Sequence, residues 1–331
     1  WLSKNMFSNC TSLENIVLPA GLVSVDPSYE STSYNSGTGP FNESGLKSVN
    51  LNGVTKLPAK IFRGASARET VTGLESVTEV GMSAFYGTSL KEVNLSSVNA
   101  LPDGVFYDCV SLEKVILNDV MSSIGAHVFR GCTSLATIDV YSLVPQGSTN
   151  NPVGVATLPS ALASVGELSF SETAIREITI PEGVTELVNG VEDYNDASDL
   201  FLNCTQLEKV VFGGEVSKIG AGTFEGCTNL KTIQYSAGGE VFGETGEATL
   251  PDGLSLIGDN AFSETAIGSV NIPSSVTVVG KYLFQNCTAL AYAEYLTPVT
   301  KYGTGATYYS TYLFDGCTSL ERVVLNSSIQ Y

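Results

Sequence analysis

Basic residues, histidine and tryptophan are scarce in this chain of 331 residues. Lys and Arg number 16 against 34 Asp and Glu, so the net charge at neutral pH is −18. Because a polyanion repels phosphate backbones and anionic lipids, we expect neither nucleic-acid binding nor attachment to an acidic membrane surface. No apolar run reaches the roughly 18 residues that a membrane-spanning helix needs. The single His and single Trp exclude histidine clusters for zinc and the clustered indoles of many sugar-binding surfaces.

A short unit that begins at a phenylalanine recurs along the whole sequence. The segments from Phe7 to Leu13, Phe129 to Leu135 and Phe314 to Leu320 all read Phe-x-x-Cys-Thr-Ser-Leu, and a shorter form without the cysteine runs from Phe85 to Leu90. Uninterrupted copies are about 22 residues apart, and about twelve copies cover the chain. They begin at Phe7, Phe41, Phe62, Phe85, Phe106, Phe129, Phe170, Phe201, Phe224, Phe262, Phe284 and Phe314. So short a period predicts a solenoid.

Each copy also predicts its own local structure. A Leu-x-x-Val-x-Leu segment, as from Leu13 to Leu18, alternates in polarity like a short strand, and a following proline such as Pro19 helps to end it. A second apolar pair comes next, and we interpret the Gly-x-x-Ala-Phe segment after it as one helical turn. One copy buries too little apolar surface to fold alone, so the copies should stack and align their strands in one parallel sheet.

Charge supports this stacking. The residue after the first strand leucine alternates in sign from copy to copy, as in Glu14, Lys47, Glu69, Lys91 and Glu113. Like charges opposite each other in neighbouring strands would repel. We therefore expect a ladder of surface ion pairs along the stack.

The Phe-x-x-Cys-Thr-Ser-Leu and Ile-Gly-x-x-Ala-Phe elements, with Leu-Pro after the strand, closely resemble the BspA-like leucine-rich repeats of the Treponema pallidum type. The resemblance implies a leucine-rich-repeat solenoid, a β-rich right-handed superhelix with one short strand per repeat in a parallel sheet and short strands or helical turns on the opposite side. It also implies secretion or surface attachment, and in some members adhesion to host matrix proteins or other cells. It supplies no catalytic residues. The segment from Arg63 to Thr72, where Arg68 takes a leucine position, departs from the pattern.

The seven cysteines share one repeat position, three residues after the phenylalanine. That placement predicts buried, unpaired thiols, although Cys109 and Cys132 could lie within disulfide reach. The lone His127 should face solvent, and no nucleophile, metal or cofactor site accompanies it. We therefore expect no enzyme. The acidic stretch from Glu192 to Asp199 lacks the glycine and the final glutamate of a calcium loop, so we expect a solvated loop and leave weak calcium binding open.

We predict a single solenoid over residues 1–331. Neither end of it has the polar pattern of a cap, so we expect a segment of a longer protein, or a solenoid that contact with another copy closes. Five insertions interrupt it, at residues 26–40, 141–157, 188–199, 236–249 and 304–311. They contain acidic residues, tyrosines and small polar residues but no Lys or Arg. Tyrosine among small polar residues is typical of binding loops, because it gives contact area at little entropic cost.

The candidate partner-binding residues are tyrosines in or near these insertions and in a late strand. They are Tyr29, Tyr34, Tyr141, Tyr194, Tyr292, Tyr295, Tyr302, Tyr308 and Tyr309. The alternative is that these rings pack the insertions onto the solenoid. Our first hypothesis is a non-catalytic, extracellular or cell-surface module for recognition or adhesion, which binds a host or cell-surface protein through its sheet face and insertion loops. A carbohydrate-binding module and a passive spacer are the alternatives.

Overall fold

The computed structural model describes residues 2–22, 37–65, 70–143, 152–187, 198–295, 301–302 (backbone only) and 312–325. The chain forms two compact units, Trp1–Val165 and Gly166–Tyr331, and each is described by itself. The insertion at 304–311 and most of those at 26–40 and 188–199 lie outside the described residues. The single solenoid over the whole chain therefore stays a prediction.

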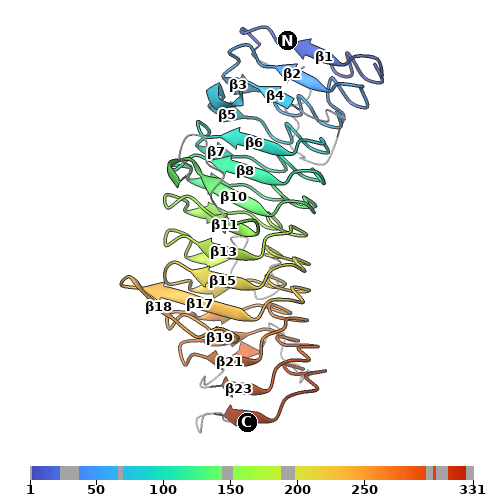
Figure 1. The fold of residues 1–331 in the computed structure, drawn as a ribbon. Coiled ribbons are helices and arrows are strands. Elements are labelled where there is room, and N and C mark those ends of the chain that lie inside the picture. Colours follow the sequence, from blue (N-terminus) through green and yellow to red (C-terminus); the bar gives the residue numbers. More distant parts are fainter. Residues whose placement is uncertain are drawn as a thin grey trace. The chain divides into compact units, whose positions relative to one another are not determined.

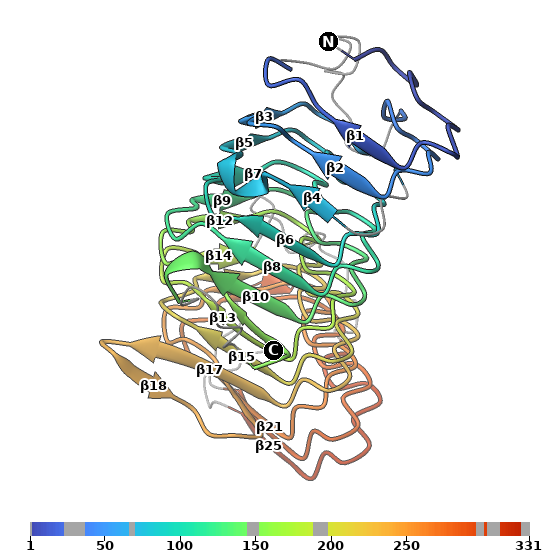
Figure 2. The ribbon, with the colours of Figure 1, turned by 45° about the horizontal axis from the view of Figure 1, so that its top comes forward.

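In the first unit, short parallel strands follow one another copy by copy on two faces (Figures 1 and 2). The main face consists of β1 (Asn15–Val17), β2 (Ser48–Asn50) and β4 (Thr70–Thr72), then β6 (Glu92–Leu95), β8 (Lys114–Leu117), β10 (Thr137–Val140) and β11 (Val155–Thr157). The second face consists of β3 (Lys56–Leu57) and β5 (Glu79–Val80), then β7 (Ala100–Leu101), β9 (Ser123–Ile124) and β12 (Ser164–Val165). The described residues of this unit also include the 3-10 helices η2 (Leu74–Ser76) and η3 (Tyr141–Leu143).

The second unit repeats this arrangement. Its main face consists of β13 (Glu177–Ile180), β15 (Lys209–Phe212), β17 (Thr232–Ala237), β19 (Glu247–Thr249), β21 (Ser269–Ile272), β23 (Tyr292–Tyr295) and β25 (Arg322–Leu325), with β18 (Glu240–Phe242) antiparallel to β17. Its second face consists of β14 (Glu186–Leu187), β16 (Lys218–Ile219), β20 (Leu256–Ile257), β22 (Val278–Val279) and β24 (Lys301–Tyr302). These parallel strands confirm the predicted β-rich solenoid class.

The core is built in register. Ile178 lies opposite Val210, and Val210 opposite Ile233, and all three side chains are buried. The repeat phenylalanines stack ring on ring; Phe85 and Phe106, for example, have centroids 5.4 Å apart. Each copy thus covers the apolar side of the next, which one copy alone could not do.

The helical turn predicted over the Gly-x-x-Ala-Phe segment is wrong. Two residues in each regular copy, two before and two after the phenylalanine, have positive φ, as at Ser83 (53°) and Gly87 (67°). Left-handed residues stop a helix from propagating, and their amides bond to the next copy instead. The N–H of Ser83 donates to the carbonyl of Asp103, and that of Gly87 to the carbonyl of Tyr107. The phenylalanine side of each unit, the turn face, is therefore a ladder of hydrogen-bonded turns.

The cysteines are free and mostly buried, as predicted: Cys10 is exposed, Cys317 is half-buried and the other five are buried. Their role is more specific than apolar packing. The Cys132 thiol donates to the carbonyl of Phe106 in the preceding copy, at 3.0 Å. The shorter copies do not omit the position, because a threonine fills it; the Thr173 hydroxyl donates to the carbonyl of Phe170 at 2.8 Å. Burial raises the pKa of the Cys132 thiol well above its usual range.

Two insertions were expected to be loops, and parts of them are strands. β11 lies in the insertion after β10 and β19 in the insertion after β17, and each pairs in parallel with the strand that it follows. At the insertion after β17, the described part of the second face gains no matching strand, since β16 pairs directly with β20, and the rings of Phe224 and Phe262 stay stacked at 5.6 Å. The extra strand lengthens the main face by about 4.8 Å at that copy.

Candidate functional site

A β-hairpin projects from the main face of the second unit. Strands β17 and β18 pair Tyr235 with Phe242, and Gly238 and Gly239 form the turn with φ of 61° and 87°. Positive φ at both turn positions suits glycine and matches the twist of a two-residue hairpin. Val241 is 58% exposed and Phe242 39% exposed. The hairpin extends beyond the ends of the neighbouring strands (Figure 1).

The hairpin is anchored to the sheet beneath it. The Nε2 of Gln234 donates to the carbonyl of Gly243 at 2.7 Å, and the N–H of Gly246 donates to the Thr232 hydroxyl at 3.0 Å. Gly243 has φ of 103°, and a Cβ there would lie 2.7 Å from the hydroxyl oxygen of Thr249. The chain can therefore pass this close only with glycine.

Two pockets adjoin the hairpin, because residues of β17 line both. One, of about 230 Å³, is lined by Tyr235, Thr249, Leu250, Asp252, Asn271, Pro273 and Ser274. The Tyr235 hydroxyl donates to Asp252 at 3.5 Å, and burial, followed by the Asp252 charge, raises the pKa of Tyr235. The other pocket, of about 590 Å³, is lined by Glu182 and Glu215 together with Ser236 to Gly239.

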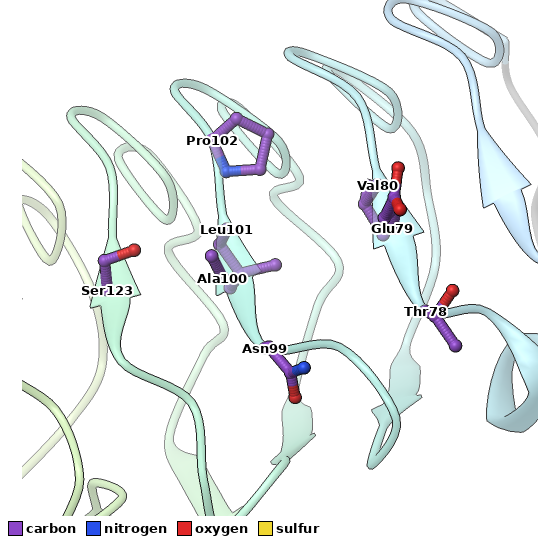
Figure 3. A pocket seen from close by; sticks show the side chains of 8 residues that line it. All are labelled: Thr78, Glu79, Val80, Asn99, Ala100, Leu101, Pro102 and Ser123. Atoms are coloured by element: carbon purple, nitrogen blue, oxygen red, sulfur yellow. The ribbon is translucent and has the colours of Figure 1, made fainter.

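A third pocket, of about 490 Å³, lies on the second face of the first unit (Figure 3). It is a shallow groove between successive copies, and Glu79 is its single ionisable lining residue. That carboxylate is already paired with Lys56 at 2.6 Å. The groove therefore lacks the paired acid and base that catalysis needs.

Of the nine predicted tyrosines, the structure describes the side chains of Tyr141, Tyr292 and Tyr295. Tyr141 is 47% exposed, whereas Tyr292 is half-buried and its hydroxyl donates to Glu294 at 3.3 Å. Tyr295 is 3% exposed; its strand position points into the core, so its assignment to a partner-binding surface is wrong. Tyr302 lies in β24. The remaining candidates lie outside the described residues: Tyr29, Tyr34, Tyr194, Tyr308 and Tyr309.

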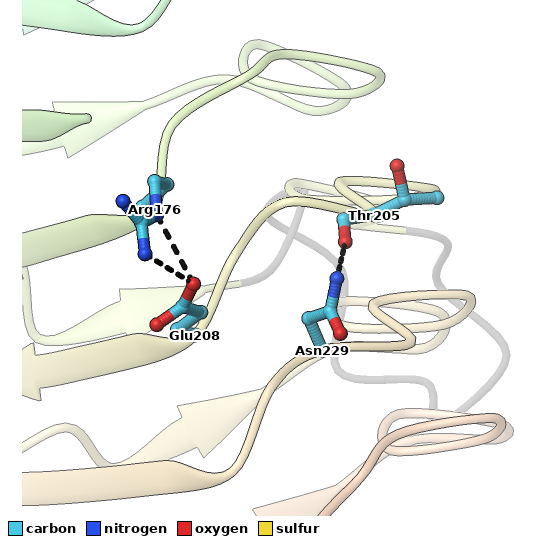
Figure 4. A network of polar contacts seen from close by, with 4 residues as sticks. All are labelled: Arg176, Thr205, Glu208 and Asn229. Atoms are coloured by element: carbon cyan, nitrogen blue, oxygen red, sulfur yellow. Dashed lines mark hydrogen bonds and ion pairs between the residues drawn. The ribbon is translucent and has the colours of Figure 1, made fainter. Parts of the chain in front are cut away.

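The predicted charge ladder is confirmed where the structure describes it. Lys47 pairs with Glu14 at 2.5 Å, and Lys91 with Glu113 at 3.6 Å. In the second unit both Nε and Nη2 of Arg176 donate to Glu208 (Figure 4). Because these side chains are about half exposed, each pair contributes on the order of 0–1 kcal/mol.

His127 is buried, not solvent-facing as predicted. It is 5% exposed, with φ of 57°, and lies edge-on to the Tyr107 ring with centroids 6.1 Å apart. Its position, two residues before the phenylalanine, lies inside the ladder of turns, where Ser83 is also buried. Within the described ranges, no three His, Cys, Asp or Glu side chains are grouped to hold a metal ion. Of the acidic stretch considered for calcium, the structure describes Ser198 and Asp199 alone.

The exposed hairpin residues Val241 and Phe242 were not among the candidates predicted from the sequence. The signal was present: a Gly-Gly pair between residues that form strands is a hairpin pattern. We interpreted residues 236–249 as one loop because they interrupt the repeat. Among the described residues, no helix has both the length and the apolar character to cross a membrane.

The stacked parallel strands, one or two per copy, define a leucine-rich-repeat solenoid. A family model described as the BspA type leucine rich repeat region (6 copies) matches residues 1–36, 35–151, 194–246 and 238–331. The chain therefore belongs to the BspA-type leucine-rich-repeat family, which confirms the resemblance drawn from the sequence. No curated protein matches the chain.

Several solved structures are similar to this one. A leucine-rich repeat protein from Bacteroides ovatus has 23% identity, with 97% of this chain and 82% of that chain covered and a TM-score of 0.51. A leucine rich cell surface protein from Faecalibacterium prausnitzii has 18% identity, coverages of 95% and 88% and a TM-score of 0.45. A leucine rich repeat protein from T. pallidum has 24% identity, coverages of 70% and 78% and a TM-score of 0.40. At such identities the Bacteroides likeness shows the fold alone.

Proposed function

We propose that this chain is a non-catalytic recognition module, at the cell surface or outside the cell, that binds a protein partner through the β17–β18 hairpin. The observation that carries the proposal is the pair of exposed apolar side chains, Val241 and Phe242, on a hairpin anchored to a rigid sheet. Binding residues are typically placed on such projections from a stable scaffold.

Apolar exposure at the hairpin calls for an explanation. Phe242 stacks on Tyr235 with ring centroids 5.0 Å apart and an interplanar angle of 16°, so the aromatic pair is already ordered. A partner that covers it loses little side-chain entropy, which favours affinity. Aromatic residues in a partly apolar patch are typical of the centre of a protein interface.

Family membership supports the location and the absence of catalysis. The BspA-type resemblance implies secretion or surface attachment and supplies no catalytic residues. A passive spacer needs neither an exposed apolar hairpin nor the pockets beside it, so these features favour recognition. Host-matrix or other cell-surface proteins are the partners that this proposal implies.

Carbohydrate binding is the second candidate, and the pocket of about 230 Å³ favours it. Tyr235, Asp252 and Asn271 line this pocket, and the Tyr235 hydroxyl donates to Asp252 at 3.5 Å. An aromatic face next to hydrogen-bonding groups is the chemistry that holds a sugar ring. Loss of glycan binding in Asp252→Ala, with Val241→Ser/Phe242→Ser unaffected, would favour this candidate.

A binding screen against purified extracellular-matrix proteins and a glycan array separates these functions. The proposal expects a matrix protein to bind wild type and to bind Val241→Ser/Phe242→Ser at least about tenfold more weakly, a loss of about 1.4 kcal/mol. The matched control is Val120→Ser, because Val120 is 62% exposed in the first unit. Unchanged melting temperatures must accompany the loss. Binding to glycans alone, or to nothing, contradicts the proposal.

A further inference from the structure

Four planar side chains form a continuous stack on the turn face of the first unit. The Arg63 guanidinium carbon lies 3.8 Å from the centroid of the Tyr86 ring. The rings of Tyr86 and Tyr107 stack with centroids 4.7 Å apart and an interplanar angle of 20°. The Arg130 guanidinium carbon lies 5.6 Å from the Tyr107 centroid. We call Arg63, Tyr86, Tyr107 and Arg130 the cation–aromatic column.

The solenoid does not require these residues. Each of them directly follows a core phenylalanine, so all four occupy the same position in successive copies. In the second unit that position is held by Ser171, Leu202, Glu225, Ser263, Gln285 and Asp315. The surrounding turns keep their left-handed residues there as well. Because serine, leucine and carboxylates serve the turn equally well, the column is not explained by folding alone.

The column is also exceptional in its charge. The chain has a net charge of −18, yet this position brings two arginines into one stack. Among the described residues, the carboxylate of Asp108 lies against it and accepts a hydrogen bond from the Tyr86 hydroxyl at 3.4 Å. Arg63 is 8% exposed and closes the stack at one end. Tyr86, Tyr107 and Arg130 are half-buried and stay accessible at the other end.

We propose that the cation–aromatic column binds an acidic segment of a partner protein. A carboxylate of the segment pairs with the Arg130 guanidinium, whose fork of donors matches carboxylate geometry. The stacked tyrosines form the platform on which a neighbouring apolar side chain of the segment packs. Tyrosine and arginine are the residues most enriched at energetic centres of protein interfaces.

The arrangement suits a short acidic peptide better than a sulfated polysaccharide. A polysaccharide bearing many negative charges meets the Asp108 carboxylate and the strongly negative chain around it, and it gains from rows of cations that the column does not offer. A peptide with one or two carboxylates needs a single accessible guanidinium beside an aromatic surface. This surface lies in the first unit and does not depend on the hairpin proposed above as the main contact.

The test uses a phage-displayed library of short random peptides, selected on the intact chain. Clones that bind the wild-type chain but do not bind the Arg130→Gln variant are sequenced. The corresponding synthetic peptides are then titrated against both proteins. The expected result is an Asp or Glu next to an aromatic or aliphatic residue, with a dissociation constant raised at least tenfold by Arg130→Gln and by Tyr107→Ser. Added salt should weaken the binding.

Two control variants keep the result interpretable. Gln285→Ala changes the same repeat position in the second unit and should leave peptide binding unchanged. Val241→Ser/Phe242→Ser should also leave it unchanged, so failure of the hairpin proposal and failure of this one are distinguishable. The proposal is overturned if every clone binds the wild-type chain and the Arg130→Gln variant equally well. It is also overturned if the clones that prefer the wild-type chain contain no acidic residue. Binding of a heparin oligosaccharide that Arg130→Gln abolishes, without acidic clones, also overturns it.

Discussion

The Lys114 ammonium lies 3.0 Å from the Asp139 carboxylate, whose side chain is fully buried in the neighbouring strand. Other ion pairs between neighbouring copies are exposed, such as that of Lys91 with Glu113. The two kinds of pair differ in energy because the buried carboxylate has lost its water.

Lys114→Met should destabilise the chain by about 3–5 kcal/mol, because it leaves a charge buried without its partner. Lys91→Met, the matched exposed control, should cost about 1 kcal/mol or less. Urea unfolding measures both. The double variant Lys114→Met/Asp139→Leu should recover most of the stability, and equal losses in the two single variants would contradict this account.

Cys132→Ala should lower the free energy of unfolding by about 1–2 kcal/mol, because the Phe106 carbonyl keeps the Cys109 N–H but loses the thiol donor, and a small cavity forms. Cys132→Thr should cost less, since Thr88, Thr173 and Thr265 occupy the same position in other copies. Cys10→Ala is the control, because Cys10 is exposed. A loss at Cys10 equal to that at Cys132 would argue against the thiol ladder.

Alkaline pH should destabilise the second unit through Cys317. Burial raises the pKa of this thiol to about 11, above the unfolded value of about 8.5. The folded state therefore holds the proton more tightly, and the resulting stability is present below about pH 8.5 and is lost as the pH rises toward 11. Melting temperatures across that range should fall less steeply in Cys317→Ser, and identical slopes would refute this assignment.

Gly258→Ala should be strongly destabilising. Its Cβ would lie 2.3 Å from the backbone nitrogen of Ala221 in the preceding copy, which cannot move without breaking the stack. Gly21→Ala is the control, because a Cβ there meets nothing within 4 Å. We expect a loss of about 2–4 kcal/mol at Gly258, comparable to an overpacked core, and a gain or no change at Gly21. Thermal unfolding of both variants measures this difference.

The strands and the shared core could be predicted from the sequence, because each copy repeats the same alternation of apolar and polar residues. Because Phe106 and Cys132 occupy positions that recur in most copies, their burial could be predicted from this one sequence. The turns could not be predicted in the same way. A Gly-x-x-Ala-Phe segment has the apolar spacing of a helix, and nothing in that spacing shows that Ser83 or Leu168 adopts positive φ.

The candidate site was less predictable, because the insertions have no repeats to compare. Residues 247–249 read as part of a loop, yet they pair on both sides as β19. Tyr295 was assigned to a surface from its residue type, although its alternate position in β23 places it in the core. His127 was placed in solvent because its repeat position is variable in sequence, yet the turns bury that position, as they do at Ser83.

The most direct test of the recognition account is site-specific cross-linking. A photoreactive residue at position 241 in the hairpin is compared with the same residue at position 120, which is equally exposed and apolar but lies in the first unit. With a matrix-protein partner from the binding screen, the account predicts a cross-link from position 241 and none from position 120. Equal cross-linking from both positions, or a cross-link from position 120 alone, would contradict it.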